Sequence, residues 1–290
     1  YHPKLLAAVP FTPATGARLL VRRGLDRVTV QRQLAAGLIG AAEHLNIATV
    51  SVNFLPEAEW DLLEDADFLK RADQQYHWYN QGYGSFDDFL DDLSSRKRKN
   101  IRRERRGALE NGIEIEWISG ADLTEAHWDA FYQFYTDTGS RKWGEPYLNR
   151  QFFSLITESM ADRILLIMCR REGRYIAGAL NLIGREALFG RYWGCIEDHP
   201  FLHFEVCYYQ AIDYAIQHGL ARVEAGAQGP HKIARGYRPT QTHSAHYIRD
   251  PGFRDAVANY LEHERKEVGQ DIEYLAERGP FRKGERQSLD

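Results

Sequence analysis

The sequence has few cysteines, no long apolar run and no excess of charge of one sign. Cys169, Cys195 and Cys207 show no CxxC spacing, which argues against a disulfide framework and favours a reducing compartment. No stretch approaches 18 consecutive apolar residues, so no membrane span is expected. The 37 basic and 41 acidic residues give a formal charge of −4, so any affinity for nucleic acid must come from a local cluster.

The chain begins at Tyr1, and its opening residues lack the charged-then-apolar layout of a secretion signal. We therefore expect a cytoplasmic protein, and a chain that is a fragment or a processed product. With 290 residues, of which 43% are apolar and 27% charged, it is long enough for one large soluble domain or two ordinary ones.

The apolar periodicity predicts strands and helices in alternation. The order along the chain predicts a mixed α/β sheet covered by helices. The first 80 residues repeat the tail of that order, so we expect the end of one half (1–82), a complete second half (83–250), and a C-terminal helix and tail (251–290). The expected strands are 4–9, 17–22, 47–55, 74–80, 113–118, 163–170, 174–183, 187–195 and 221–226, and the main helices are 29–45, 57–68, 86–111, 147–160, 203–218 and 253–278.

Four segments resemble a known family: VPFTPATGARLL, RKRKNIRRERRGALENGIEIEW, LHFEVCYYQAIDYAIQHGL and GAQGPHKIARGYRPTQTHSAHYI. Together they are similar to the Fem-like group of N-acyltransferases in the GNAT superfamily, which carries a peptidoglycan biosynthesis label. The resemblance covers nearly the whole chain and implies two GNAT-like halves in tandem, the first incomplete at its N-terminus. It implies transfer of an acyl group to the amine of a lipid, a peptide or a small molecule, with acyl-CoA as co-substrate and no tightly bound cofactor.

Two features of the Fem and GNAT enzymes are absent from the sequence. There is no long coiled-coil hairpin, which the Fem enzymes associate with tRNA binding, and no Q/R-x-x-G-x-G/A pyrophosphate signature before a helix. Three functions therefore stay open. The first is an acyl-CoA-dependent transferase, the second an aminoacyl-tRNA-dependent Fem-type transferase, and the third a non-catalytic module that binds a cell-wall peptide or an amino lipid.

A strongly basic segment spans residues 96–106, where eight of eleven residues are basic. So many like charges on one helix repel each other, and a bound anion would offset that cost. We expect Arg98, Arg102 and Arg103 to bind an anionic donor such as CoA phosphates. The alternative is a solvated helix face balanced by the aspartates just upstream.

The start of helix 203–218 and the segment after strand 221–226 hold the expected catalytic groups. Glu205 lies in the first helical turn, where it should be ionised and able to accept a proton. His231 suits proton transfer because its ordinary pKa lies near neutrality. Tyr237 completes the expected catalytic set, and a glycine-rich structural turn is the alternative for its segment.

Further residues are expected to bind substrate or donor. A cation such as Lys232 can pair with a carboxylate or a phosphate. His243 and His246 alternate along a strand, which puts them on opposite faces, so no metal site is expected. The expected binding residues are Thr12, Thr15 and Arg18 in a proline-rich loop, Tyr192 and Trp193 as pocket walls, His203 at the helix start, and Gln228, Gly229, Lys232 and Arg235.

Overall fold

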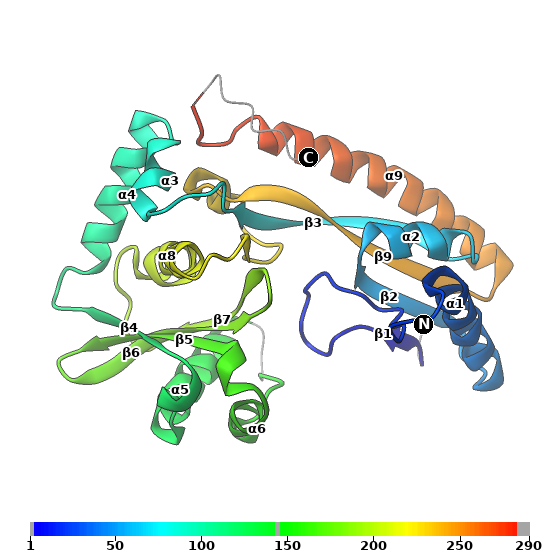
Figure 1. Ribbon diagram of the computed structural model, residues 1–290, viewed down its shortest axis with the longest axis horizontal. Helices are drawn as coiled ribbons and strands as arrows, with labels where there is room; N and C mark the ends of the chain where they lie inside the picture. The colour runs from blue at the N-terminus through cyan, green and yellow to red at the C-terminus, as the bar shows by residue number, and fades with distance from the viewer. Residues whose placement is uncertain (1–2, 143–145, 283–290) are drawn as a thin grey trace. The chain divides into compact units, whose positions relative to one another are not determined.

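A computed structural model describes residues 3–142 and 146–282 (Figure 1). The chain divides into two compact units: unit 1 is Tyr1–Gln75 with Pro239–Glu277, and unit 2 is Tyr76–Arg238 with Arg278–Asp290. The chain therefore returns to unit 1 after Arg238, a connection that the order of elements does not reveal. The ranges 1–82, 83–250 and 251–290 describe repeated halves rather than compact units, and they stay a prediction.

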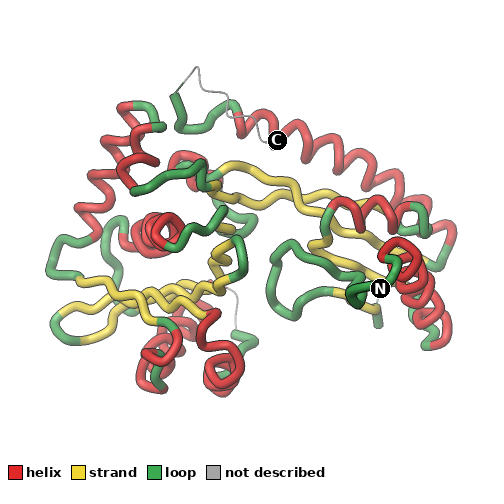
Figure 2. Tube along the Cα trace, in the orientation of Figure 1, coloured by secondary structure: helices red, strands yellow, loops and turns green. Residues whose placement is uncertain are grey.

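Unit 1 is built on the strands β1 (Leu5–Ala7), β2 (Thr49–Leu55), β9 (Arg238–Ile248) and the first part of β3 (Leu69–Tyr79). Strand β1 is parallel to β2, and β2 is antiparallel to β9. Its helices are α1 (Arg27–His44), α2 (Glu57–Glu64) and α9 (Pro251–Ala276), and α9 is one uninterrupted helix (Figure 2). A buried cluster of Ala35, Ala42, Val50, Val52, Leu55, Leu63 and Ala245 joins α1 and α2 to the sheet.

The strand expected at 17–22 is wrong, because this segment is a loop held by side-chain hydrogen bonds. The main-chain N–H groups of Arg18 and Leu19 donate to the buried carboxylate of Glu59. The Arg18 guanidinium donates to the carbonyls of Ala14, Gly16 and Asn53. These polar groups are satisfied locally, so the segment needs no strand partner.

Unit 2 contains a mixed sheet with helices on both faces. Figure 1 shows α5 (Glu125–Lys142) and α6 (Arg150–Met160) on one face and α8 (Gln210–Gln217) on the other. Trp128, Phe131, Phe134 and Phe153 form the core beneath α5 and α6. The strands are β4 (Glu114–Ile118), β5 (Ile164–Arg171), β6 (Arg174–Ile183), β7 (Ala187–Cys195), β8 (Arg222–Glu224) and the end of β3.

The strands follow the order β1-β2-β9-β3-β8-β7-β6-β5-β4, so the mixed α/β fold class is confirmed. Parallel and antiparallel pairs occur together, as with β7 beside β8 and β6 beside β7. Within the described ranges, no helix has the length and apolar character needed to cross a bilayer.

The single helix expected at 86–111 is two helices, α3 (Phe86–Asp91) and α4 (Ser95–Ala108). The expected cap is present, because the Ser85 side chain accepts from the N–H of Asp88. The break follows from tertiary pairing, in which Leu93 forms a bridge with Phe281 and the Ser94 N–H donates to the carbonyl of Pro280. Backbone groups engaged in this pairing cannot continue the helical ladder.

Candidate functional site

The candidate site of unit 2 lies where β7 and β8 separate. These parallel strands pair only at Ala187–Phe189 and Arg222–Glu224, whereas β7 continues to Cys195. After β8 the chain follows β3 instead, because Ala225 N–H donates to Tyr76 O and Tyr76 N–H donates to Gly226 O. In the described part of the chain, no strand pairs with residues 190–195 on the β8 side. A strand edge of this kind can pair with the backbone of an extended ligand.

A short 3₁₀ helix, Pro230–Arg235, follows the separation and lies between two glycines with positive φ, Gly229 (96°) and Gly236 (92°). These backbone angles are strained for any residue with a side chain. A Cβ atom at Gly229 would also lie 2.3 Å from Cε1 of His231. Gly229 thus allows the imidazole of His231 to lie against the main chain. From the sequence, this glycine indicated only that backbone or ligand can approach closely.

His231 is exposed, and its Nε2 lies 3.0 Å from the hydroxyl oxygen of Tyr208. Burial lowers the pKa of His231, and the positive charges of Arg235 and Lys232 lower it further. The imidazole is therefore neutral at pH 7. When Nε2–H donates to Tyr208, Nδ1 holds a free lone pair that can accept a proton.

Lys232 and Arg235 hold this 3₁₀ helix in place. The Lys232 ammonium donates to the carbonyl of Ala225 at 2.5 Å and lies near the rings of Tyr76 and Tyr208. The Arg235 guanidinium donates to the carbonyl of His231 at 2.8 Å and pairs with Glu104 at 2.9 Å. Both side chains are buried. The Lys232 ammonium therefore holds the main chain at Ala225, and the Arg235 guanidinium holds the main chain at His231 and the carboxylate of Glu104.

Lys232 gives the protein a testable pH dependence. Burial lowers the pKa of Lys232 to about 8 from the ordinary 10.5, so its charged form costs stability below pH 8. That cost disappears as pH rises from 8 to 10.5, and it amounts to about 3 kcal/mol at about 1.4 kcal/mol per pKa unit.

We expect the free energy of unfolding of the parent protein to rise between pH 8 and 9.5 relative to Lys232→Met. Urea unfolding at each pH measures this difference, and comparison with the variant cancels the tyrosines that titrate near pH 10. If the free energy of unfolding changes with pH in the same way for the two proteins, Lys232 has the same pKa in the folded and the unfolded state.

Glu205 lies in a wide helical turn and forms a buried ion pair. The helix runs from α7 (Leu202–Phe204) through a π-helical turn (Glu205–Tyr209) into α8. The carboxylate of Glu205 is 1% exposed and accepts from Arg105 Nη2 at 3.0 Å and from Gln210 Nε2 at 2.7 Å. Arg105 Nη2 also donates to Asp213 at 2.6 Å. Burial raises the pKa of Glu205, although Arg105 opposes the effect.

Tyr237, expected to be catalytic, lies in the core. Its side chain is 1% exposed, and its hydroxyl donates to the main-chain carbonyl of Tyr208 at 3.4 Å. Burial raises the pKa of Tyr237 well above its ordinary value. Its position beneath the π-helical turn supports the side chains of that turn, and nothing exposes it to a substrate.

The aromatic residues expected to line a pocket fall into two groups. Trp193 packs against His203, with ring centroids 5.4 Å apart, and His203 packs against Tyr208, so both lie beside the helical turn next to His231. Tyr192 instead contacts Tyr147 through a 2.8 Å contact between their hydroxyl oxygens. Trp193 and His203 therefore belong with the His231 group, whereas Tyr192 points toward the α5 side of the sheet, where it contacts Tyr135.

The basic helix α4 has two different faces. Arg98 pairs with Asp91 at 2.6 Å and Arg102 with Asp87 at 2.9 Å, so the upstream aspartates do balance part of the charge. Arg103 is exposed, and among residues 3–142 and 146–282 it has no ion-pair partner. Glu104 and Arg105 point inward and bind residues of the helical turn Glu205–Tyr209. The sequence did not single them out, because the composition of a helix does not show which side chains point inward.

The remaining expected residues belong to unit 1 or lie at the surface of the His231 loop. Gln228 is exposed just before Gly229. Thr12, Thr15 and Arg18 belong to unit 1, where the Thr12 hydroxyl donates to Pro10 O and Arg18 holds its own loop. His243 and His246 also belong to unit 1 and contact different partners: His243 stacks on Trp60 and His246 bonds to Ser51.

Comparison with known proteins identifies the family. The FemAB-like family, described as peptidoglycan biosynthesis/recognition, matches residues 1–283. The chain belongs to the FemAB-like family. The Fem-like resemblance of the sequence is therefore confirmed over nearly its whole length.

Solved structures share the fold of this FemAB-like protein at low sequence identity. L-PGS from Bacillus licheniformis has a TM-score of 0.57 at 10% identity, covering 79% of this chain and 78% of that chain. FemX has a TM-score of 0.57 at 14% identity, covering 87% and 85%. A search of the curated proteins finds no match. The expected Fem-type arrangement is thus confirmed as a fold.

Proposed function

We propose that this FemAB-like protein is a transferase that moves an acyl group from an activated donor to an amine at the open edge of β7. The observation that carries the proposal is the separation of β7 from β8 with a neutral, exposed imidazole, His231, on the chain that leaves β8. Membership of a family described by peptidoglycan biosynthesis/recognition supports a peptide or peptidoglycan-precursor amine as the acceptor.

The proposed reaction needs one proton acceptor and no covalent enzyme intermediate. The amine nitrogen attacks the donor carbonyl carbon and forms the new C–N bond, and the carbonyl oxygen takes the negative charge. His231 accepts the proton that the nitrogen loses, and the leaving group departs with its electron pair as the carbonyl re-forms. Acyl-CoA releases a thiolate, whereas an aminoacyl ester releases a ribose oxygen that takes the proton from His231. Main-chain N–H groups along the β7 edge are suited to stabilise the oxyanion.

The donor is proposed to be acyl-CoA, with an aminoacyl ester of tRNA as the alternative. Both carry an activated carbonyl and phosphates, and the exposed side of α4 offers basic side chains such as Arg103 to either. Arg98 and Arg102 are already paired with aspartates, so they contribute less than the sequence predicted.

The direct test is product formation with purified protein. Acetyl-, octanoyl- and palmitoyl-coenzyme A, and an aminoacylated tRNA mixture, are each incubated with a muropeptide amine and with a panel of simple amines, and the amide is detected by mass spectrometry. A product with any donor supports the transferase. A protein that binds the muropeptide yet forms no amide with any donor is a binding module, and the transferase proposal is then wrong.

Arg103 offers a test of the donor interaction. We expect Arg103→Glu to weaken donor binding severalfold at 20 mM salt and much less at 500 mM, because exposed charges are screened at high ionic strength. The matched control is Arg102→Glu, whose side chain already pairs with Asp87. Equal donor affinity of the parent and Arg103→Glu at low salt would place the donor phosphates elsewhere.

A further inference from the structure

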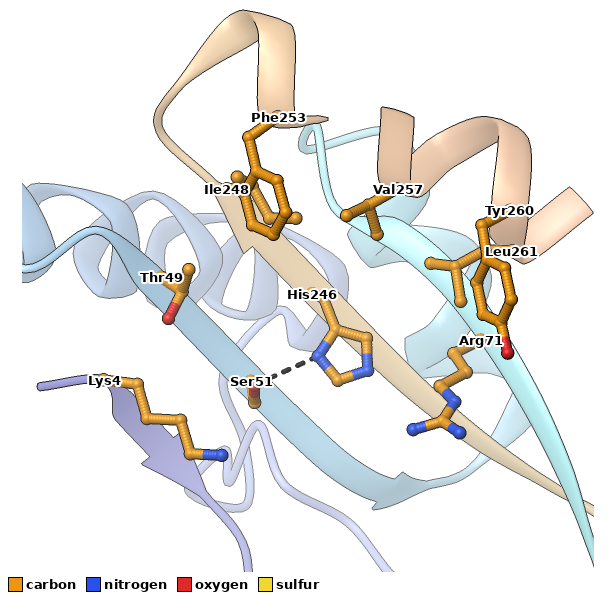
Figure 3. Close-up of a pocket in the computed structure, with 10 residues that line it drawn as sticks. All are labelled: Lys4, Thr49, Ser51, Arg71, His246, Ile248, Phe253, Val257, Tyr260 and Leu261. Atoms are coloured by element: carbon orange, nitrogen blue, oxygen red, sulfur yellow. Dashed lines mark hydrogen bonds between the residues drawn. The ribbon is translucent and has the colours of Figure 1, made fainter. Parts of the chain in front are cut away.

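Unit 1 contains a cavity of about 310 Å³ between its sheet and α9 (Figure 3). Its sheet side carries the polar groups of Thr49, Ser51 and His246 together with Ile248, and Arg71 and Lys4 lie beside them. Its helix side carries Phe253, Val257, Tyr260 and Leu261. The cavity thus has one polar wall and one largely apolar wall.

The polar wall is set by the register of two strands. Ser51 on β2 is directly opposite His246 on β9, and their side chains are joined at 3.0 Å between Oγ and Nδ1. The other ring nitrogen of His246, Nε2, is buried and has no hydrogen-bond partner within the described ranges. A buried polar atom without a partner is costly, and a ligand can satisfy it.

Positive charge flanks this pair. Figure 3 shows the Lys4 ammonium on one side of the Ser51–His246 pair and the Arg71 guanidinium on the other. Arg71 uses Nε and Nη2 for Glu264, at 3.0 and 3.1 Å, which leaves Nη1 available. Lys4 has no ion-pair partner in the described part of the chain.

The charge of His246 follows from these neighbours. Burial, followed by the positive charges of Arg71 and Lys4, lowers the pKa of His246 to about 4, and Glu264 on α9 opposes this shift. Tyr260 is the other titratable group of α9 that lines the cavity. The imidazole is therefore neutral at pH 7, and the surroundings favour an added negative charge.

The apolar wall comes from α9. Phe253, Val257 and Leu261 are spaced four residues apart and therefore lie on one face of the helix. An apolar helix face normally packs against apolar sheet residues, as α1 and α2 do on the cluster around Val50 and Val52. In contrast, α9 faces hydroxyl, imidazole and cationic groups besides Ile248, a mismatch that an amphipathic ligand would resolve.

We propose that this cavity binds a small amphiphile of about eight carbons, with a carboxylate head and an apolar tail. The head would lie between Lys4 and Arg71 beside Ser51 and His246, and the tail along Phe253, Val257 and Leu261. At about 30 Å³ per water-sized group, 310 Å³ holds roughly ten non-hydrogen atoms, the size of octanoate. The site is distinct from the transferase site proposed in unit 2, and neither proposal depends on the other.

Calorimetric titration with octanoate tests the head group. We expect octanoate to bind the full chain and octanamide, which has the same shape without the charge, to bind at least tenfold more weakly. Lys4→Gln should weaken octanoate binding at least tenfold, whereas Lys266→Gln, an exposed change on the outer side of α9, should leave it unchanged. Equal binding of octanoate and octanamide, or no octanoate binding at millimolar concentration, overturns the proposal.

Val257→Trp tests the tail by filling the cavity. Octanoate binding should be lost in this variant and kept in Ala256→Trp, which adds the same ring at an exposed position of α9. A folded Val257→Trp that binds octanoate like the parent overturns the proposal. If that variant does not fold, the comparison of Lys4→Gln with Lys266→Gln decides the question alone.

Discussion

His231→Ala is expected to lower the turnover number by roughly 10²-fold or more, the usual effect of losing a general acid–base group. In the proposed reaction the neutral, exposed imidazole, on the chain that leaves β8, accepts the proton of the amine. Rates with a fixed donor and acceptor, measured from pH 5 to 9, check the prediction. Because the pKa of His231 lies below its ordinary value, the parent's acid-side decline in rate should fall below pH 6.5 and should be absent from the variant.

Two further variants separate catalysis from folding. Gly229→Ala should also lose activity, because its Cβ would collide with the His231 ring and its backbone angle is strained. Gln217→Ala, an exposed change at the end of α8, should retain the parent rate. If His231→Ala keeps the parent turnover and pH profile, another group accepts the proton.

Arg105→Met is expected to lower the free energy of unfolding by about 3–5 kcal/mol, the cost of breaking a buried ion pair by removing one partner. The change leaves the carboxylates of Glu205 and Asp213, 1% and 18% exposed, without their shared cation. Urea unfolding at pH 7 measures the loss. Arg106→Met removes an exposed arginine from the same helix and should change stability by no more than about 0.5 kcal/mol.

The deficit of Arg105→Met should shrink as pH falls toward 5. Burial raises the pKa of Glu205 and of Asp213 even with Arg105 present. A carboxyl group whose pKa is higher in the folded state is favoured in its protonated form, so its ionisation costs stability as pH rises. Removing the cation enlarges that cost, and protonation relieves it. A deficit that is constant from pH 5 to 8 would show that packing, and not charge, is lost.

The sequence predicted the larger elements well, because strong apolar periodicity and turn residues define them. Helix α9, for example, lies close to the expected helix 253–278, and strand β9 includes the alternating THSAHYI segment. It failed where tertiary contacts decide local structure. The segment 17–22 is a loop because the buried carboxylate of Glu59 binds its N–H groups, a contact 40 residues away in the chain.

The site residues stay a prediction, and the structure shows contacts for several of them that the sequence did not indicate. The segment that includes Gly229 and His231 follows the separation of β7 and β8, whereas its glycines had indicated only that backbone or ligand can approach closely. Lys232 and Arg235 were expected to bind substrate. Both are buried, and Lys232 donates to a main-chain carbonyl whereas Arg235 pairs with Glu104. Burial depends on the three-dimensional neighbours of a residue, so composition and spacing could not separate an exposed Arg103 from an inward Arg105.

The division of unit 1 between two distant chain segments constrains how the protein folds during synthesis. Residues 1–75 leave the ribosome before their partners in β9 and α9, which follow only after about 160 more residues at roughly 5–20 residues per second. Strand β2, with Val50, Val52 and Leu55 fully buried in the finished protein, must wait for its neighbour β9. Unit 2, which is almost continuous in sequence, can form before unit 1 is complete. Residues 1–75 are made before unit 2 but complete their fold after it, so they depend longer on protection from aggregation.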